Sequence, residues 1–163
     1  MIRIVHPLAT ANSLELKVPP AALTVVTAAL MWFASLTVPA FDFSLPANVA
    51  CSAGFVLAGA LACLAGVCSF QRAKTTVNPM KLDSSSALVA SGIYKYSRNP
   101  MYLGFVLVLF GWGLFLSNAL ALLLLPAFVL YMSRFQICPE ERALLSLFGK
   151  DYKQYHARVR RWL

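Results

Sequence analysis

The chain has 163 residues, of which 60% are hydrophobic and only 12% are charged, and its mean hydropathy is +0.70. A soluble domain carries about 25% charged residues, so the composition excludes an ordinary soluble fold and indicates one membrane domain. The net charge of +8 comes from 14 Lys and Arg against six Asp and Glu. In a membrane protein this surplus is typical of cytoplasmic loops, and we predict no nucleic-acid binding.

The first two apolar runs cover about residues 20–40 and 46–70. Each has the roughly 20 residues that a helix needs to cross about 30 Å of hydrocarbon. Residues 1–17 have no continuous apolar core, so we do not expect a cleaved signal there. The four cysteines form no CxxC pair and none stands at ligand spacing from a histidine, so neither a disulfide nor a metal site is predicted.

After a polar segment, 71–100, a third apolar run extends from Met101 to Ser133 and is long enough for two short spans. Ser117 and Asn118 are the polar pair in its middle, so we predict a tight helical hairpin between spans of about 101–117 and 118–134. Pro126 is expected to kink the returning helix. A single bent helix is the alternative. The predicted fold is an all-α membrane protein of about four spans.

The basic residues predict the orientation of these spans. With four spans, the amino-terminal segment, the polar segment and the carboxy-terminal tail lie on one side. All 14 Lys and Arg fall on that side, two before the first span, five in the polar segment and seven from Arg134 onward. We therefore expect the termini and the polar segment to be cytoplasmic.

The tail is predicted to be helical. Pro139 suits a first helical turn, and Glu140 and Glu141 suit the positive end of the helix dipole. Gly149 is placed to end this helix. A second segment repeats apolar and aromatic residues at helical spacing. Its expected face is formed by Tyr152, Tyr155, Val159 and Trp162.

Two polar segments, 92–104 and 139–155, are brought to the same membrane side by the hairpin. Arg98 offers a forked donor for a carboxylate, and Glu140 and Glu141 can accept from an amine or balance a cation. The tyrosine faces nearby attract a positive centre. S-adenosylmethionine has an amine, a carboxylate, a sulfonium and a flat base, so we predict catalytic roles for these three residues. An interfacial anchor and a simple helix cap are the alternatives.

Together the two segments resemble the isoprenylcysteine carboxyl methyltransferase and phospholipid methyltransferase superfamily of membrane enzymes. The family pattern reads Gly-x-Tyr, Arg-His-Pro-x-Tyr-x-Gly, a hairpin, Glu-Glu, Phe-Gly and paired tyrosines. The resemblance covers residues 82–163, which it implies are the cofactor-binding part. Asn99 stands where the carboxyl methyltransferases have His, and Asn-Pro-Met-Tyr looks like the phospholipid N-methyltransferase version. The matching residues are Gly92, Tyr94, Arg98, Pro100, Tyr102, Gly104, Glu140, Glu141, Phe148, Gly149, Tyr152 and Tyr155.

The resemblance implies S-adenosylmethionine as cofactor and a lipid-like or small membrane-soluble acceptor. Gln136 stands where the carboxyl methyltransferases place an arginine facing the acceptor carboxylate, and Arg134 lies close enough to substitute, so both are expected to bind substrate. Glu140 is expected to hold the amino-acid end of the cofactor. The residues implied to contact the cofactor are Ser86, Ala87, Leu88, Val89, Tyr94, Asn99, Pro100, Met101, Tyr102 and Glu140.

The sequence leaves the acceptor open among an isoprenylcysteine carboxylate, a phospholipid amine and a thiol. Two other functions also stay open. One is a nicotinamide-dependent membrane reductase of the sterol reductase type, and the other is a non-catalytic membrane scaffold. The sequence does not indicate an oligomeric state.

Overall fold

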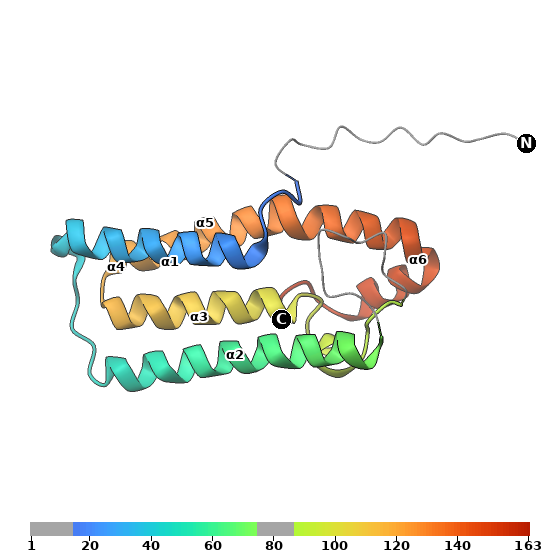
Figure 1. Cartoon of the computed structure of the whole chain (residues 1–163), viewed down its shortest axis with the longest axis horizontal. Helices are drawn as coiled ribbons and strands as arrows, with labels where there is room; N and C mark the ends of the chain where they lie inside the picture. Colours follow the sequence, from blue (N-terminus) through green and yellow to red (C-terminus); the bar gives the residue numbers. More distant parts are fainter. Residues whose placement is uncertain (1–14, 75–86) are drawn as a thin grey trace, which may run out of the picture.

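The computed structural model describes residues 15–74 and 87–163, and every extended regular element within these ranges is a helix. Four long rods lie side by side and alternate in direction along the chain (Figure 1). They are α1 (Pro20–Thr37), α2 (Asn48–Arg72), α3 (Pro100–Leu116) and the helical stretch Ala119–Arg158. This arrangement confirms the predicted all-α membrane fold.

The rods have the length and composition of membrane helices. Pro20–Thr37, Asn48–Arg72 and Ala119–Arg158 are each long and apolar enough to cross a membrane, and α3 is an apolar helix of 17 residues. Large apolar side chains point outward from them, and Val25 and Leu130 are 68% and 69% exposed. Because a helix satisfies its own backbone hydrogen bonds, such a surface is stable in hydrocarbon.

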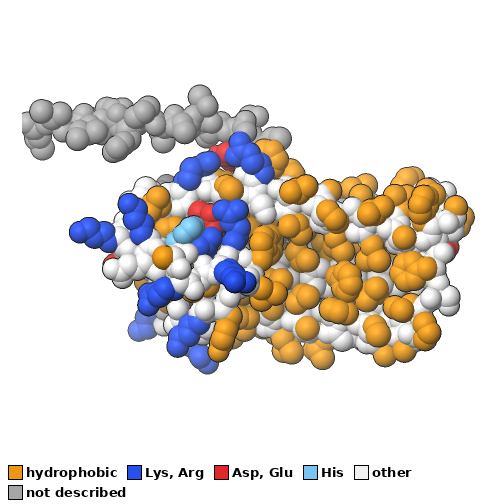
Figure 2. Space-filling model, turned by 180° about the vertical axis from the view of Figure 1, so that it is seen from behind, with side chains coloured by type: hydrophobic (Ala, Val, Ile, Leu, Met, Phe, Trp, Pro, Cys, Tyr) orange, Lys and Arg blue, Asp and Glu red, His pale blue; other side chains and the backbone are white. Residues whose placement is uncertain are grey.

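Charge is confined largely to one end of the bundle. Figure 2 shows Lys and Arg side chains gathered at that end, while hydrophobic side chains cover the rest of the visible face. The charged end carries α6 (Cys138–Arg158) and the short helix η3 (Gly92–Lys95). The two polar segments singled out in the sequence therefore lie at the same end.

The predicted hairpin is present at the opposite end. Ser117 has a positive φ of 52°, and the side chain of Asn118 accepts a hydrogen bond from the Ala121 N–H at 3.0 Å. The same amide donates to Asp42 Oδ1 at 2.8 Å and to the Val38 carbonyl at 3.1 Å. Asn118 is fully buried, so these bonds satisfy a polar group that would otherwise be costly. A single bent helix is therefore ruled out.

The returning helix breaks three residues before the predicted kink. It consists of α4 (Ala119–Leu122) and α5 (Leu124–Tyr131), which are separated at Leu123. Pro126 has no N–H to donate to the Leu122 carbonyl, and a proline disturbs the turn that precedes it. The expected disturbance is present, but it lies before Pro126 and not at it.

Small residues let α2 and α3 approach closely. A Cβ atom added to Gly59 would lie 2.5 Å from the Gly104 carbonyl oxygen, and one added to Gly111 would lie 2.8 Å from the Ser52 carbonyl oxygen. Neither position can hold a larger residue without a shift of the backbone. Close packing of this kind is how membrane helices associate without a hydrophobic driving force.

The tail differs from the prediction at its start. The structure has no break before Pro139, because α5 continues through a π-helical turn, η4 (Met132–Ile137), directly into α6. The wider turn accommodates Pro139, which cannot donate to the carbonyl of Phe135. That carbonyl accepts instead from the Leu16 N–H at 3.1 Å.

The end of the tail also differs. Gly149 interrupts α6 as predicted, with φ 49° and ψ −112°, and the helix resumes until Arg158. Val159 is extended, with φ −118° and ψ 132°, so it does not continue the face of Tyr152 and Tyr155. The predicted four-residue helical face is therefore wrong beyond Tyr155.

Candidate active site

A buried polar triad joins α3 to the start of α6. The Tyr102 hydroxyl donates to Glu140 Oε1 at 2.5 Å, and Gln136 Nε2 donates to the same oxygen at 2.6 Å. Tyr102 and Gln136 are only 8% and 3% exposed. Among the described residues, nothing donates a hydrogen bond to the second oxygen, Oε2. The triad therefore holds a carboxylate in place and leaves one of its oxygens for another partner.

The sequence explains how the triad is assembled. Pro100 begins α3, where its fixed φ suits the first turn and its missing N–H costs nothing, and Tyr102 follows in that turn. Gln136 lies four residues before Glu140, so the two side chains share a helical face. Gln136 also lies in the π-helical turn, a feature that is frequent at functional sites.

The environment of Glu140 changes its acidity. Glu140 lies in the charged helix α6, outside the apolar parts of the bundle. Burial raises the pKa of the Glu140 carboxyl to about 7, against the opposing effect of the bonds from Tyr102 and Gln136. The negative charge of Glu141 adds to the rise of this pKa. A carboxylate that titrates near neutrality inside the protein can respond strongly to a bound cation.

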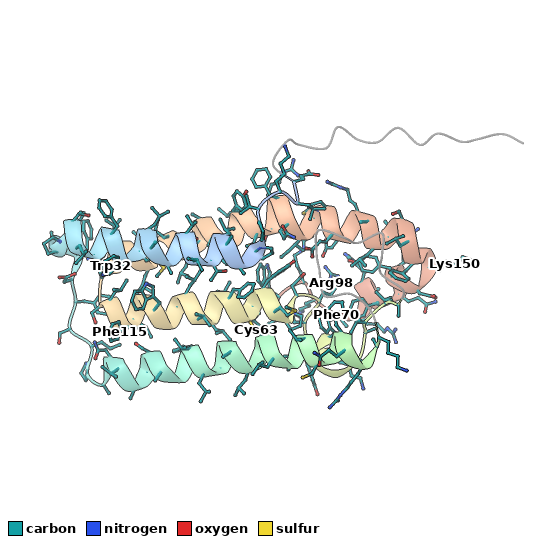
Figure 3. All side chains as sticks on the ribbon, viewed as in Figure 1. Trp32, Cys63, Phe70, Arg98, Phe115 and Lys150 are labelled. Atoms are coloured by element: carbon teal, nitrogen blue, oxygen red, sulfur yellow. The ribbon has the colours of Figure 1, made fainter. Side chains whose placement is uncertain are left out.

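The second glutamate has a different set of partners. Glu141 Oε1 accepts from Arg98 Nη2 at 2.9 Å, and both of its oxygens accept from Arg161, with Nε at 3.1 Å and Nη2 at 2.6 Å. Arg98 Nη1 also donates to the carbonyls of His156 and Val159 at 2.9 and 3.1 Å. Figure 3 labels Arg98 where the start of α3 meets the tail.

Arg98 is largely engaged by protein acceptors. Its side chain is 8% exposed, and both terminal nitrogens donate hydrogen bonds to the protein. These nitrogens and Nε together carry five N–H groups, of which three have acceptors among the described residues. Nε is buried without a hydrogen-bond partner among the described residues, so its N–H is available to a ligand.

The other predicted cofactor contacts fall into two groups. Asn99, Pro100, Met101 and Tyr102 lie at the start of α3, and the Asn99 amide donates to the Arg161 carbonyl at 3.0 Å. Met101 packs against α2, where a Cβ on Gly66 would contact its side chain.

The second group precedes α3 in the chain. Ala87, Leu88 and Val89 are non-helical, and Val89 is buried, whereas Ser86 lies outside the described residues. Tyr94 is buried in η3 with its ring 5.4 Å from that of Phe70, and burial raises the pKa of its hydroxyl.

The two predicted acceptor residues diverge. Gln136 faces inward and bonds to Glu140, whereas the side chain of Arg134 is 54% exposed and lies 3.7 Å from the Glu15 carboxylate. Arg142 pairs with the same carboxylate. Of the two predicted acceptor residues, Gln136 belongs to the triad, and Arg134 lies apart from it among the described contacts.

No group of three His, Cys, Asp or Glu side chains suited to a metal ion occurs in ranges 15–74 and 87–163.

Sequence reasoning missed Glu15 and Arg161. Glu15 stands between Leu14 and Leu16 before the first span, and nothing in this local sequence indicates partners 119 and 127 positions away, at Arg134 and Arg142. Arg161 was one of several basic tail residues. Its pairing depends on the extended backbone after Arg158, which the predicted helical face did not allow.

Comparisons with known proteins place the chain in a family. The family model described as phospholipid methyltransferase matches residues 47–151. The chain is 48% identical over 63 residues to an uncharacterised protein of Haemophilus influenzae, covering 39% of this chain and all of that protein. No solved structure matches.

Other relatives have named activities. The chain is 35% identical over 79 residues to the protein-S-isoprenylcysteine O-methyltransferase of Schizosaccharomyces pombe, covering 48% of this chain and 34% of that enzyme. It is 39% identical over 67 residues to methanethiol S-methyltransferase 1 of Bradyrhizobium diazoefficiens, covering 41% of this chain and 22% of that enzyme. Both matches thus span about a third or less of the named enzymes. Taken with the family match and the apolar helical bundle, they show that the chain belongs to the phospholipid methyltransferase family of integral membrane methyltransferases.

Proposed function

We propose that this protein transfers a methyl group from S-adenosylmethionine to a lipid-like acceptor at the charged end of the bundle. The observation that carries the proposal is the convergence of the Asn-Pro-Met-Tyr turn and the twin-glutamate helix at the Tyr102–Glu140–Gln136 triad. Family membership supplies the reaction class, and the triad supplies a location for it.

The residues present fit the charged groups of S-adenosylmethionine. Glu140 keeps one oxygen without a bond from any described residue, and a buried carboxylate suits the ammonium group of the cofactor. The buried Arg98 Nε–H lacks a partner, and it can donate to the cofactor carboxylate. Tyr94 and Tyr152 add buried aromatic faces at the same end, which favour a cationic sulfur.

In this mechanism the protein mainly binds and orients. S-adenosylmethionine, when bound, supplies a methyl group already activated on a sulfonium. Glu140, held by Tyr102 and Gln136, fixes the amino-acid end, while the α3 turn forms one wall of the site. Because Tyr102 and Gln136 are buried, water is kept from this side of the site. Holding the acceptor about 3–3.5 Å from the methyl carbon then provides most of the catalysis.

The acceptor is proposed to be an amphipathic amine or thiol. Gln136 carries no charge, so the inward-facing position offers no cation for an acceptor carboxylate, and Arg134 points away and pairs with Glu15. The named relatives act on an isoprenylcysteine and on methanethiol. We propose that an apolar acceptor reaches the site from the bilayer, because Tyr102 belongs to α3, a helix made almost entirely of apolar residues.

The first test is binding of S-adenosylmethionine to the purified chain by isothermal titration calorimetry. We expect binding by the parent chain and loss of binding by Glu140→Ala. Tyr96→Ala is the control, because this tyrosine is 76% exposed. If the parent chain binds NADPH and not S-adenosylmethionine, the reductase alternative replaces this proposal. If it binds neither, the scaffold alternative does.

The acceptor is then identified with radiolabelled methyl transfer. Phosphatidylethanolamine, a farnesylcysteine analogue and a small alkanethiol represent the amine, carboxylate and thiol classes. We expect label in the amine or the thiol. Label found only in the farnesylcysteine carboxylate would contradict the role given to Gln136.

The charged end is proposed to face the cytoplasm, in line with the positive-inside rule. Ser44 lies between α1 and α2 at the uncharged end, and Lys150 follows the kink of α6 at Gly149, at the charged tip of the bundle (Figure 3). Single-cysteine variants at these two positions would be labelled in intact cells with a membrane-impermeant maleimide. Labelling is expected at position 44 and not at position 150, and the reverse result would invert the topology.

A further inference from the structure

A non-helical segment after α6, residues 159–162, is bonded to the turn that begins α3. The Arg98 N–H donates to the Arg160 carbonyl at 3.0 Å, and the Asn99 amide and the Ser97 hydroxyl donate to the Arg161 carbonyl at 3.0 and 3.4 Å. Trp162 packs against the hydrophobic core of the bundle. The segment is thus held along its backbone and at its end.

The side chain of Arg161 connects this segment to α6. Its guanidinium forms a forked pair with Glu141, and Glu141 in turn bonds to Arg98. Forked arginine–carboxylate pairs are both stronger and more directional than single bonds. Arg161 supplies two of the three hydrogen bonds that Glu141 receives from described side chains. The geometry of the Arg98–Glu141 bond therefore depends on Arg161.

Two cross-links connect the same pair of helices side by side. Arg98 precedes Tyr102 by four residues, and Glu140 and Glu141 are neighbours, so Arg98–Glu141 and Tyr102–Glu140 both join the start of α3 to the first turn of α6. We therefore expect a change at the first cross-link to affect the second. Among the described residues, Gln136 is the other side chain that bonds to Glu140 in the triad.

We propose that Arg161 is a positioning residue of the methyl-transfer site, which acts through Glu141 to hold the triad together and to neutralise the charge beside Glu140. The proposal rests on the function proposed above, because it assigns Arg161 to the same site. Arg161 itself touches neither Glu140 nor Tyr102 through any described contact. Its effect on ligand binding is therefore indirect.

The charges around Glu140 predict a measurable effect of Arg161, namely a shift in the pH dependence of cofactor binding. The groups that act on Glu140 are the hydroxyl of Tyr102, the amide of Gln136 and the negative charge of Glu141. Glu141 is balanced by Arg98 and Arg161. Removing the charge of Arg161 leaves Glu141 less neutralised, which raises the pKa of Glu140 further. Binding of a cation that requires ionised Glu140 then needs a higher pH.

The test uses the full chain and three substitutions. Arg161→Gln removes the charge and the fork, whereas Arg161→Lys keeps the charge without the fork. Arg160→Gln is the matched control. It also removes one positive charge, but from an exposed side chain at the neighbouring position. The affinity for S-adenosylmethionine is measured by calorimetry between pH 5.5 and 8.5.

We expect Arg161→Gln to shift the pH midpoint of binding upward by about half a unit and to weaken binding at pH 8.5 by about tenfold. Arg161→Lys should keep the parent midpoint and lose part of the affinity, because it restores the charge without the geometry. Arg160→Gln should behave as the parent chain.

A Glu141→Gln variant independently tests the direction in which the charge of Glu141 shifts the pH midpoint of binding. It removes the negative charge beside Glu140, so its midpoint is expected to shift downward. If Arg161→Gln behaves like Arg160→Gln while the parent chain binds the cofactor, the inference about Arg161 is wrong and the proposed function stands. If the parent chain does not bind at any pH, the proposed function fails. If Arg161→Gln does not fold, Arg161→Lys decides, and parent-like affinity in that variant overturns the role of the fork.

Discussion

Glu140 and Glu141 are neighbours in the first turn of α6, yet their partners differ in kind. Glu140 receives hydrogen bonds from two neutral side chains, Tyr102 and Gln136. Glu141 receives bonds from two guanidinium groups, those of Arg98 and Arg161. Arginines balance the negative charge of Glu141, whereas no residue in ranges 15–74 and 87–163 forms an ion pair with Glu140.

This difference suggests different roles for the two glutamates. A carboxylate with two cationic partners has little reason to attract a third cation. A buried carboxylate with neutral partners is held in place but lacks a counter-charge among the described residues. We therefore propose that Glu140 binds the ligand and that Glu141 supports the fold, although the sequence presents the two as an identical pair.

The largest expected effect is on folding, from Glu141→Ala. The substitution leaves the Arg98 guanidinium, which is 8% exposed, without its charged partner. Breaking a buried ion pair by removing one partner costs about 3 kcal/mol or more. The measurement is the free energy of unfolding in detergent micelles.

Glu15→Ala is the matched control for Glu141→Ala. Glu15 also pairs with two arginines, but the side chains of Arg134 and Arg142 are 54% and 53% exposed. Removing Glu15, whose own side chain is 8% exposed, leaves two exposed guanidinium groups that water already solvates, so we expect a loss of about 1 kcal/mol or less. Equal losses in the two variants would remove the distinction between leaving a buried arginine and leaving exposed arginines without a partner.

Glu140→Gln is expected to have opposite effects on stability and binding. Raising the pKa of Glu140 from 4.5 to about 7 means that the folded protein becomes less stable as the pH rises through this interval. The neutral amide avoids this loss, so the variant should be more stable than the parent chain at pH 8, by at most about 3 kcal/mol, and equally stable at pH 4.5. Cofactor binding should fall about a hundredfold. If Glu140→Gln is less stable than the parent chain at pH 8, the expectation that the pKa of Glu140 is raised in the folded protein is wrong.

The pH dependence of cofactor binding by the parent chain tests which group of the cofactor Glu140 contacts. If bound cofactor requires the carboxylate, affinity should be constant above pH 7 and fall about tenfold for each unit below it. S-adenosylhomocysteine keeps the ammonium group but has no sulfonium. The same pH dependence for both ligands would assign Glu140 to the ammonium group, and a dependence for S-adenosylmethionine alone would assign it to the sulfonium.

The smallest expected effect comes from Tyr102→Phe. It removes one hydrogen bond to Glu140 and keeps the ring, so binding should weaken about five- to tenfold at pH 7. Calorimetry measures the change, with Tyr96→Phe as the exposed control. A hundredfold loss would mean that the hydroxyl contacts the ligand directly.

The arrangement of the membrane helices could be predicted from the sequence, because apolar length and polar breaks are local signals. Residues 117–118 turn the chain as predicted, and the basic residues gather at one end. The irregular parts could not be predicted. The π-helical turn and the non-helical segment after Arg158 have partners distant in the chain. Leu16 donates to the Phe135 carbonyl, and Ser97 and Asn99 donate to the Arg161 carbonyl.

The same limit applies to the site. Tyr102, Glu140 and Gln136 were identified from motifs, but motifs do not state which partner a side chain already has. Arg98 has the residue type that a carboxylate ligand needs, yet its terminal nitrogens are bonded within the protein. Arg134 has the right charge, yet it faces Glu15. Residue type therefore indicated where the candidate site lies. Only the packing showed which of its polar groups are already bonded within the protein.

The π-helical turn at Met132–Ile137 has a consequence for how the helix carrying Glu140 is oriented about its axis. Such a turn contains one residue more than a regular helix would use, and each residue rotates a helix by about 100°. Shortening the turn by one residue would restore regular winding and swing the Glu140 side chain away from Tyr102 by roughly a quarter of a circle. A single extra residue in the chain therefore sets the direction in which the acidic end of the tail faces.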